Sequence, residues 1–112
     1  KSSAASDVYK RQEYHSLSQD KSGRHMEPFL IDVAPSEDGV DFVLSTHEGE
    51  EFIYVLEGVL TYYLNGQENV LYPGDSYHSF GNVPHTFVNL SNNLTKVLYI
   101  VTPPLSVGNF NL

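Results

Sequence analysis

The chain has 112 residues, 40% of them hydrophobic, with no cysteine and no apolar run long enough for a membrane helix. These features exclude a disulfide framework and a cysteine metal site, and they predict one cytoplasmic globular domain without a membrane partner. Acidic residues outnumber Lys and Arg by 14 to 6, and residues 27–112 hold eleven acids and one cation, Lys96, for a net charge of −10. This charge excludes the basic surface that nucleic-acid binding requires, so we expect no direct nucleic-acid contact by this domain.

The beginning of the chain differs from the rest. Residues 1–12 read KSSAASDVYKRQ, and small polar residues without apolar periodicity are typical of a disordered tail or a non-native segment. We therefore expect residues 1–13 to be such a tail and residues 14–112 to form a single domain. Because the chain begins with Lys1 rather than Met, we also expect that a natural start lies upstream.

From Tyr14 onward the pattern is that of short β-strands. Apolar runs alternate with turn residues such as Asn65-Gly66, and no segment keeps the 3.6-residue period of a helix. The predicted strands are 29–33, 40–44, 52–56, 59–64, 70–72, 76–80, 85–90 and 96–102. Regularly spaced short strands predict an all-β sandwich or small barrel.

One predicted strand is apolar on both faces. Residues 52–56 read Phe-Ile-Tyr-Val-Leu, so both sides of this strand need cover. Together with the aromatic pair Tyr62-Tyr63, it leaves more apolar surface than one small domain should expose. We therefore expect a homodimer.

Three candidate metal ligands stand at the beginnings of predicted strands. His47 and Glu51 are separated by three residues just before strand 52–56, and His85 begins strand 85–90. Two imidazoles and one carboxylate suit Fe, Mn, Zn or Ni and leave coordination positions open for water or substrate. From spacing alone, three solvated polar residues at strand ends remain the alternative.

The spacing around these residues resembles the two sequence motifs of the cupin superfamily. The residues at motif positions are Gly39, Ser45, His47, Glu51 and Gly58 in the first, and Gly74, Phe80, Asn82, His85 and Asn89 in the second. The resemblance implies a cupin-like double-stranded β-helix, or jelly-roll, as a small barrel with its motif core at 39–89. It also implies that His47, Glu51 and His85 converge on a divalent metal ion.

The match departs from the family pattern at the first histidine of the first motif, which is Ser45 here. Three of the four usual ligands remain, so the site holds a metal with three ligands or is an empty pocket that binds an organic molecule. We expect Ser45 and Asn89 as further pocket residues, with Ser45 able to bond a metal-bound water. His78 is a third pocket candidate, for which a strand residue bonded to a neighbouring carbonyl is the favoured alternative.

Three stretches narrow the resemblance. Residues 26–30, 47–58 and 101–104 are similar to the cupin sensor half of bacterial helix-turn-helix (XRE-type) transcriptional regulators. This implies a domain that binds a small-molecule effector for a regulator whose DNA-binding half lies upstream. The alternative is an enzyme, a mononuclear non-haem iron oxygenase or isomerase with a 2-His-1-carboxylate site. Lys96 is nearly alone as a cation in the core, which disfavours a phosphonate substrate.

Overall fold

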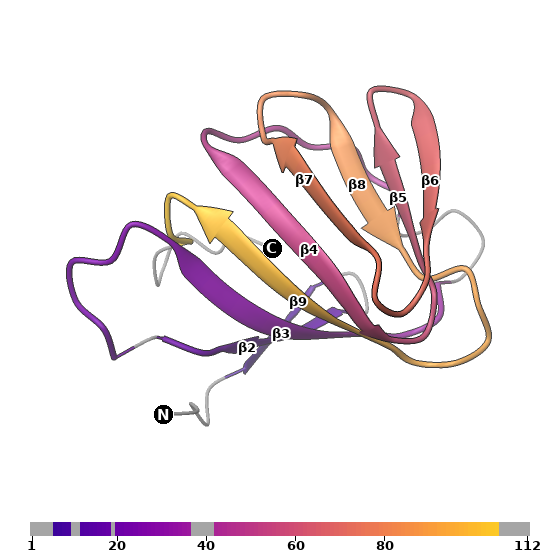
Figure 1. Cartoon of the computed structure of the whole chain (residues 1–112), viewed down its shortest axis with the longest axis horizontal. Helices are drawn as coiled ribbons and strands as arrows, with labels where there is room; N and C mark the ends of the chain where they lie inside the picture. The colour runs from indigo at the N-terminus through magenta and orange to yellow at the C-terminus, as the bar shows by residue number, and fades with distance from the viewer. Residues whose placement is uncertain (1–5, 10–11, 19, 37–41, 106–112) are drawn as a thin grey trace.

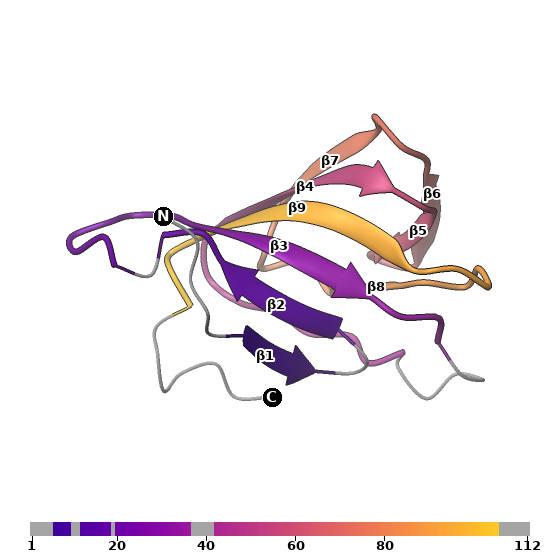
Figure 2. The ribbon, with the colours of Figure 1, turned by 90° about the horizontal axis from the view of Figure 1, so that it is seen from below.

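Nine antiparallel β-strands make up the computed structural model, which describes residues 6–9, 12–18, 20–36 and 42–105. Six of them form one sheet, in which neighbours lie side by side in the order β1-β2-β3-β9-β4-β7 (Figure 2). These strands are β1 (Ser6–Tyr9), β2 (Gln12–Ser16), β3 (Glu27–Val33), β9 (Thr95–Thr102), β4 (Glu50–Glu57) and β7 (Ser76–Phe80). The second sheet consists of β6 (Gln67–Leu71), β5 (Leu60–Leu64) and β8 (His85–Val88), in that order (Figure 1). The prediction of an all-β jelly-roll fold is confirmed.

The core lies between the two sheets and follows from period-two alternation along the strands. In β9 every second residue is buried, including Val97, Tyr99 and Val101, while the residues between them are partly or fully exposed. Ile53 and Val55 do the same in β4. β-Branched and aromatic side chains fit a pleated surface, and burying each large apolar side chain stabilises the fold by about 1.5–3 kcal/mol.

The Asn65-Gly66 turn forms as its sequence predicts. Leu64 pairs with Gln67, so these two residues alone connect β5 and β6. Both have positive φ, 50° for Asn65 and 82° for Gly66. A two-residue hairpin loop of this kind matches the twist of its strands, and Asn-Gly tolerates it best. The turn thereby sets the register of the second sheet.

The structure differs from the sequence prediction at the beginning of the chain. Ser6–Tyr9 and Gln12–Ser16 are strands, where a tail through residue 13 was expected. β2 pairs with β3 along its length and buries Gln12, Tyr14 and Ser16. Ladder hydrogen bonds depend on the backbone, so a largely polar strand paired on both sides forms without an apolar pattern. Residues 1–5 and 10–11 lie outside the described residues.

Two further predictions need correction. The strand expected at 40–44 is not formed in its described part, because Phe42, Val43 and Leu44 are exposed and only Ser45 beyond them makes an isolated bridge. Residues 40 and 41 lie outside the described residues. Tyr62 is 1% exposed, so it adds nothing to the apolar surface on which the dimer prediction partly rested. Within the part of the chain that the structure describes, no helix is long and apolar enough to cross a membrane.

Candidate metal centre

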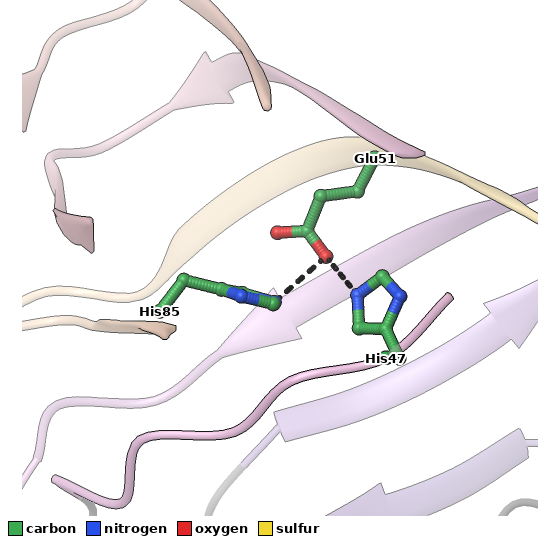
Figure 3. Close-up of side chains that lie close together, drawn as sticks. All are labelled: His47, Glu51 and His85. Atoms are coloured by element: carbon green, nitrogen blue, oxygen red, sulfur yellow. Dashed lines mark hydrogen bonds and ion pairs between the residues drawn. The ribbon is translucent and has the colours of Figure 1, made fainter. Parts of the chain in front are cut away.

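Three side chains, one from each sheet and one from the segment before β4, meet at one point (Figure 3). Glu51 is the second residue of β4, His85 is the first residue of β8, and His47 lies in the segment before β4. The Oε1 atom of Glu51 is 3.0 Å from Nε2 of His47 and 3.2 Å from Nε2 of His85. One ligand atom from each residue lies within 4.8 Å of the others. The three expected ligands are therefore brought together, although His85 follows Glu51 by 34 residues.

Backbone hydrogen bonds hold the two histidines in place. Ser45 and His85 exchange two N–H···O bonds of 3.0 and 3.1 Å, which tie the segment before β4 to the start of β8. The amide of His47 donates to the carbonyl of Gly81 at 2.8 Å, and the amide of Gly81 donates to Gly49. The segment that carries His47 is thus fixed to the turn that precedes His85.

Backbone carbonyls determine which ring nitrogen of each histidine carries the proton. Nδ1 of His47 lies 2.7 Å from the carbonyl of Glu48, and Nδ1 of His85 lies 2.7 Å from that of Val83. A carbonyl only accepts hydrogen bonds, so each Nδ1 carries the proton. In the neutral imidazole this leaves the lone pair on Nε2, directed at the meeting point, as in proteins whose metal-binding histidines donate their other N–H to an outer partner.

The two measured distances between Glu51 and the histidines fit a single ion. Ligands about 2.1 Å from one metal lie ~3.0 Å apart at a right angle and ~3.4 Å apart at the tetrahedral angle. The separations of 3.0 and 3.2 Å between Glu51 Oε1 and the two Nε2 atoms fall in this range. Without metal, the same Nε2 atoms donate to the carboxylate only when they are protonated. A metal ion and these protons therefore compete for one place.

The carboxylate of Glu51 is 2% exposed and has a full set of partners. The hydroxyl of Tyr99 donates to its Oε1 at 2.9 Å, and the hydroxyl of Tyr62 donates to its Oε2. Tyr62 is in turn 2.8 Å from Oγ of Ser79. Burying a charged group is costly unless it is hydrogen-bonded, and these tyrosines meet that cost while they fix the direction of the carboxylate.

The electrostatics of the cluster favour its charged forms. Burial acts to raise the pKa of Glu51, but the hydrogen bonds with His47 and His85 outweigh it and hold that pKa well below its usual range. The hydrogen bond to Glu51 raises the pKa of His47 above 6.5. For His85, burial acts to lower the pKa, yet the hydrogen bond and charge of Glu51 leave it raised. Metal binding must therefore release protons from these imidazoles.

A cavity of about 80 Å³ lies beside the three ligands. Its walls include Ser45, Tyr14, Thr86 and Tyr99, and none of the described residues that line it is a lysine or arginine. Typical small-molecule pockets measure roughly 300–1,000 Å³, so this one admits a few waters or a small polar group. Ser45, predicted from the sequence as a pocket residue, is one of the residues that line this cavity.

The other two pocket candidates lie elsewhere. His78 is on the outward side of β7, where its side chain is 61% exposed and its Nε2 lies 2.7 Å from Glu50 Oε1. Asn89 is fully buried, and its amide donates to the carbonyls of Val33 and Asn93. Neither residue is among those that line the cavity beside the ligands, because β7 turns Ser79 inward instead of His78, and Asn89 fastens the loop after β8.

Several residues around the centre escaped the sequence prediction. Tyr62 and Tyr99 read as packing residues, since only their tertiary contacts distinguish a tyrosine bonded to a carboxylate from one packed in a core. Gly81 had no visible signal either. A Cβ at this buried position would lie 2.3 Å from the imidazole of His47, so only glycine lets that ring occupy its place. Gln12, expected in a tail, also lines the cavity.

Comparisons with known proteins agree with this architecture. A family model described as the cupin domain matches residues 29–101, well over half of the chain. The HTH-type transcriptional regulator PuuR of Escherichia coli (strain K12) is 39% identical over 57 residues, which are 51% of this chain and 31% of that protein. The matched part thus spans less than a third of the regulator's length.

Solved structures resemble the chain over most of its length. The cupin domain of an XRE family transcriptional regulator from Enterobacter cloacae has a TM-score of 0.69 and 22% identity, covering 84% of this chain and 98% of that one. The Fe(II) form of HppE has a TM-score of 0.74 and 24% identity, covering 90% of this chain and 56% of that one. At these identities both likenesses show the fold alone.

Proposed function

The chain belongs to the cupin family, and from this premise we propose that it is the effector-sensing domain of a bacterial transcriptional regulator, with a divalent metal ion in its binding site. The observation that carries the proposal is the cluster of His47, Glu51 and His85 inside a domain similar to part of one regulator and folded like the cupin domain of another. The rest of such a regulator would supply DNA binding, since this domain is strongly acidic. A DNA-binding regulator works in the cytoplasm, where we place the protein.

The metal would be held by Nε2 of His47, Nε2 of His85 and Oε1 of Glu51. An ion there supplies a Lewis acid with open positions for an oxygen or nitrogen atom of the effector. Imidazole and carboxylate ligands accept Fe, Mn, Zn and Ni alike. The protein's own residues do the rest: Glu51 offsets part of the ion's charge, Tyr62 and Tyr99 orient Glu51, and Ser45 offers a hydroxyl at the cavity wall.

The cavity limits the effector that we propose. Its size suits a small polar molecule or the polar end of a larger one. A phosphonate or phosphate dianion needs cationic partners, and the described lining offers neither lysine nor arginine. We further propose that the domain works as a homodimer, because a sensor acts when ligand occupancy shifts an assembly between two states.

A second function has one specific observation in its favour. Two histidines and one carboxylate on one side of an ion form the facial triad of non-haem iron oxygenases. HppE, a similar fold, occurs in an Fe(II) form. A mononuclear iron oxygenase or isomerase is therefore the alternative function of this site.

Metal content tests the site. We expect protein purified without chelator and without nickel affinity resin to bind one divalent ion per chain, as measured by elemental analysis and calorimetric titration. His47→Ala and His85→Ala should abolish binding, whereas His78→Ala should leave it unchanged because His78 points outward. Equal affinities in all four proteins would exclude this centre.

Oxygen consumption separates the two functions. For a sensor we expect the iron-loaded domain to consume no oxygen in response to small organic acids, alcohols or amines, and the full gene to encode a helix-turn-helix segment before the cupin. Substrate-dependent oxygen consumption that is lost in Glu51→Ala would overturn the sensor in favour of the oxygenase.

A further inference from the structure

The outward face of the six-stranded sheet carries an apolar band near one end of its strands. Cross-strand neighbours form two rows, Pro28, Ile100, Phe52 and His78 in one, and Leu30, Leu98, Tyr54 and Ser76 in the next. Within the band Leu30 is 38% and Tyr54 37% exposed, and Leu56 beyond them is 47% exposed. Contiguous exposed apolar surface of this kind marks an interaction site.

A protruding aromatic side chain stands at one margin of this band. Phe80, the last residue of β7, is 63% exposed, more than any other large hydrophobic residue that the structure describes. Glu48 and Glu50 lie beside it and line a hollow together with Phe80 and Asn82. This margin is therefore an aromatic projection flanked by Glu48 and by Glu50, whose Oε1 lies 2.7 Å from Nε2 of His78.

The opposite margin is hollow and carries charges of both signs, with Asp20 among its lining residues and Glu27 paired to Arg24. The connection between β2 and β3 encloses a space of about 640 Å³ whose apolar walls include Leu17, Met26 and Pro28. Lys21 and Arg24 line the same space. Arg24 is held there by Glu27 at 3.2 Å and by a bond to the carbonyl of Lys21 at 2.7 Å. A volume in this range accommodates an aromatic side chain with room to spare.

The two margins lie at the same end of the sheet. Glu27 pairs with Val101, and Glu50 pairs with both Thr102 and Phe80, so the β2–β3 connection and the end of β7 are level across β3, β9 and β4 (Figure 1). When two such sheets face each other about a two-fold axis along the strands, the β3 side of each copy lies over the β7 side of the other at that end. The margins therefore meet twice in one dimer.

We propose that a second copy of this chain docks on the apolar band, with Phe80 of each copy seated in the Leu17–Met26–Pro28 hollow of the other. Glu48 and Glu50 then face Lys21 and Arg24 across the contact, in both halves of the interface. Aromatic anchors in pockets dominate interface energies, and complementary charge fixes the register. This surface rests on the proposed dimer and does not involve the metal ligands.

The first test removes the anchor. Light scattering and sedimentation should give a dimer for the unaltered chain at micromolar concentration, and Phe80→Ala should raise its dissociation constant by about 10- to 100-fold. Tyr72→Ala is the matched control, because Tyr72 is 57% exposed but lies in the β6–β7 connection, at the opposite end of β7 from Phe80, and its loss should change nothing. Circular dichroism confirms that each variant is folded.

The second test exchanges the charges. Glu50→Lys and Lys21→Glu should each weaken the dimer alone, since each places like charges together in both contacts. An equimolar mixture should dimerise again, because both contacts of the mixed dimer then join opposite charges. A monomeric unaltered chain would overturn the dimer and this surface together. A dimer indifferent to Phe80→Ala and to both exchanges would overturn this surface alone.

Discussion

At the scale of single residues, the centre is a competition between protons and a metal for the same atoms. Both imidazoles donate an Nδ1–H hydrogen bond to a backbone carbonyl, and both Nε2 atoms face Glu51. The carboxylate favours protonated imidazoles and a metal ion alike. The pH therefore decides which of them occupies the site.

Metal affinity should fall on acidification. Coordination needs neutral imidazoles, and Glu51 raises the pKa of His47 and of His85 above 6.5 in the metal-free protein. Affinity is thus full only above these raised pKa values and declines as the pH falls through them. Calorimetric titration with Zn²⁺ from roughly pH 8 down to pH 5.5 measures this decline. In the metal-free protein, Glu51→Gln should lower the pKa of both imidazoles, since the charge that raises them is gone, and NMR titration of the imidazole resonances measures this. Unshifted pKa values would contradict this account.

Gly81→Ala should remove metal binding without unfolding the protein. Its Cβ would lie 2.3 Å from the His47 ring and 2.7 Å from the His47 carbonyl oxygen, so the ring and its segment must both shift, while the strands of the core lie outside this contact. We expect a loss of affinity close to that of His47→Ala, measured by the same titration. Asn82→Ala, an exposed neighbour, serves as the control. Unchanged affinity in Gly81→Ala would show that His47 is not needed in its present position.

At the scale of elements, turn geometry and close backbone approach hold the strands in register. Gly49 and Gly66 share a φ of +82°, a conformation that disfavours other residues. Gly66 has open space around it, whereas a Cβ on Gly49 would lie 1.6 Å from the carbonyl oxygen of Thr102. The same residue type thus has two roles, one in a free hairpin and one where β4 meets the end of β9.

Substituting alanine for Gly66 and for Gly49 should distinguish the cost of the backbone conformation from the cost of a steric collision. Gly66→Ala should lower the free energy of unfolding by about 1–2 kcal/mol, the cost of the backbone conformation alone. Gly49→Ala adds a collision with the backbone of Thr102, so we expect a loss larger by at least ~2 kcal/mol. Urea denaturation measures both. Equal losses would mean that the start of β4 shifts away from β9 at little cost.

At the scale of the whole molecule, a metal ion would join the two sheets. Glu51 lies in the six-stranded sheet and His85 in the three-stranded sheet, so an ion bound to both couples them. The proposed dimer surface lies on the outward side of the same large sheet, away from the ligands. A bound metal ion and the proposed dimer contact would therefore lie on opposite faces of β4.

Metal should stabilise the fold independently of dimer contacts. An ion present at about 100 times its Kd adds ~2.7 kcal/mol to the free energy of unfolding, a rise in Tm of roughly 10 °C for a domain of this size. Differential scanning calorimetry with and without Zn²⁺ should show this rise in the unaltered chain and in Phe80→Ala. His85→Ala should show none. A rise that survives in His85→Ala would place the stabilising ion elsewhere.

Local pattern was sufficient for most of the fold. Period-two alternation in 96–102, the Asn65-Gly66 turn and the strand 76–80 all form as predicted, because each depends on neighbours within a few residues. The same approach failed at β2, a polar strand held by pairing with β3, and at Phe42–Leu44, an apolar run that stays exposed. Whether a strand finds a partner, and whether an apolar run is covered by other side chains, depends on parts of the chain that are distant in sequence.

For the site, sequence by itself determined the ligand types, since His47, Glu51 and His85 stand at spacings that resemble a metal-binding family. Only the tertiary structure decided how they are used. It turned His78 outward and closed Asn89 into a loop, set Tyr62 and Tyr99 against the carboxylate, and made Gly81 the residue that leaves room for His47. The physical reason is that orientation, burial and close approach depend on strands packed across two sheets, whereas a pattern along one chain records only which residues are available.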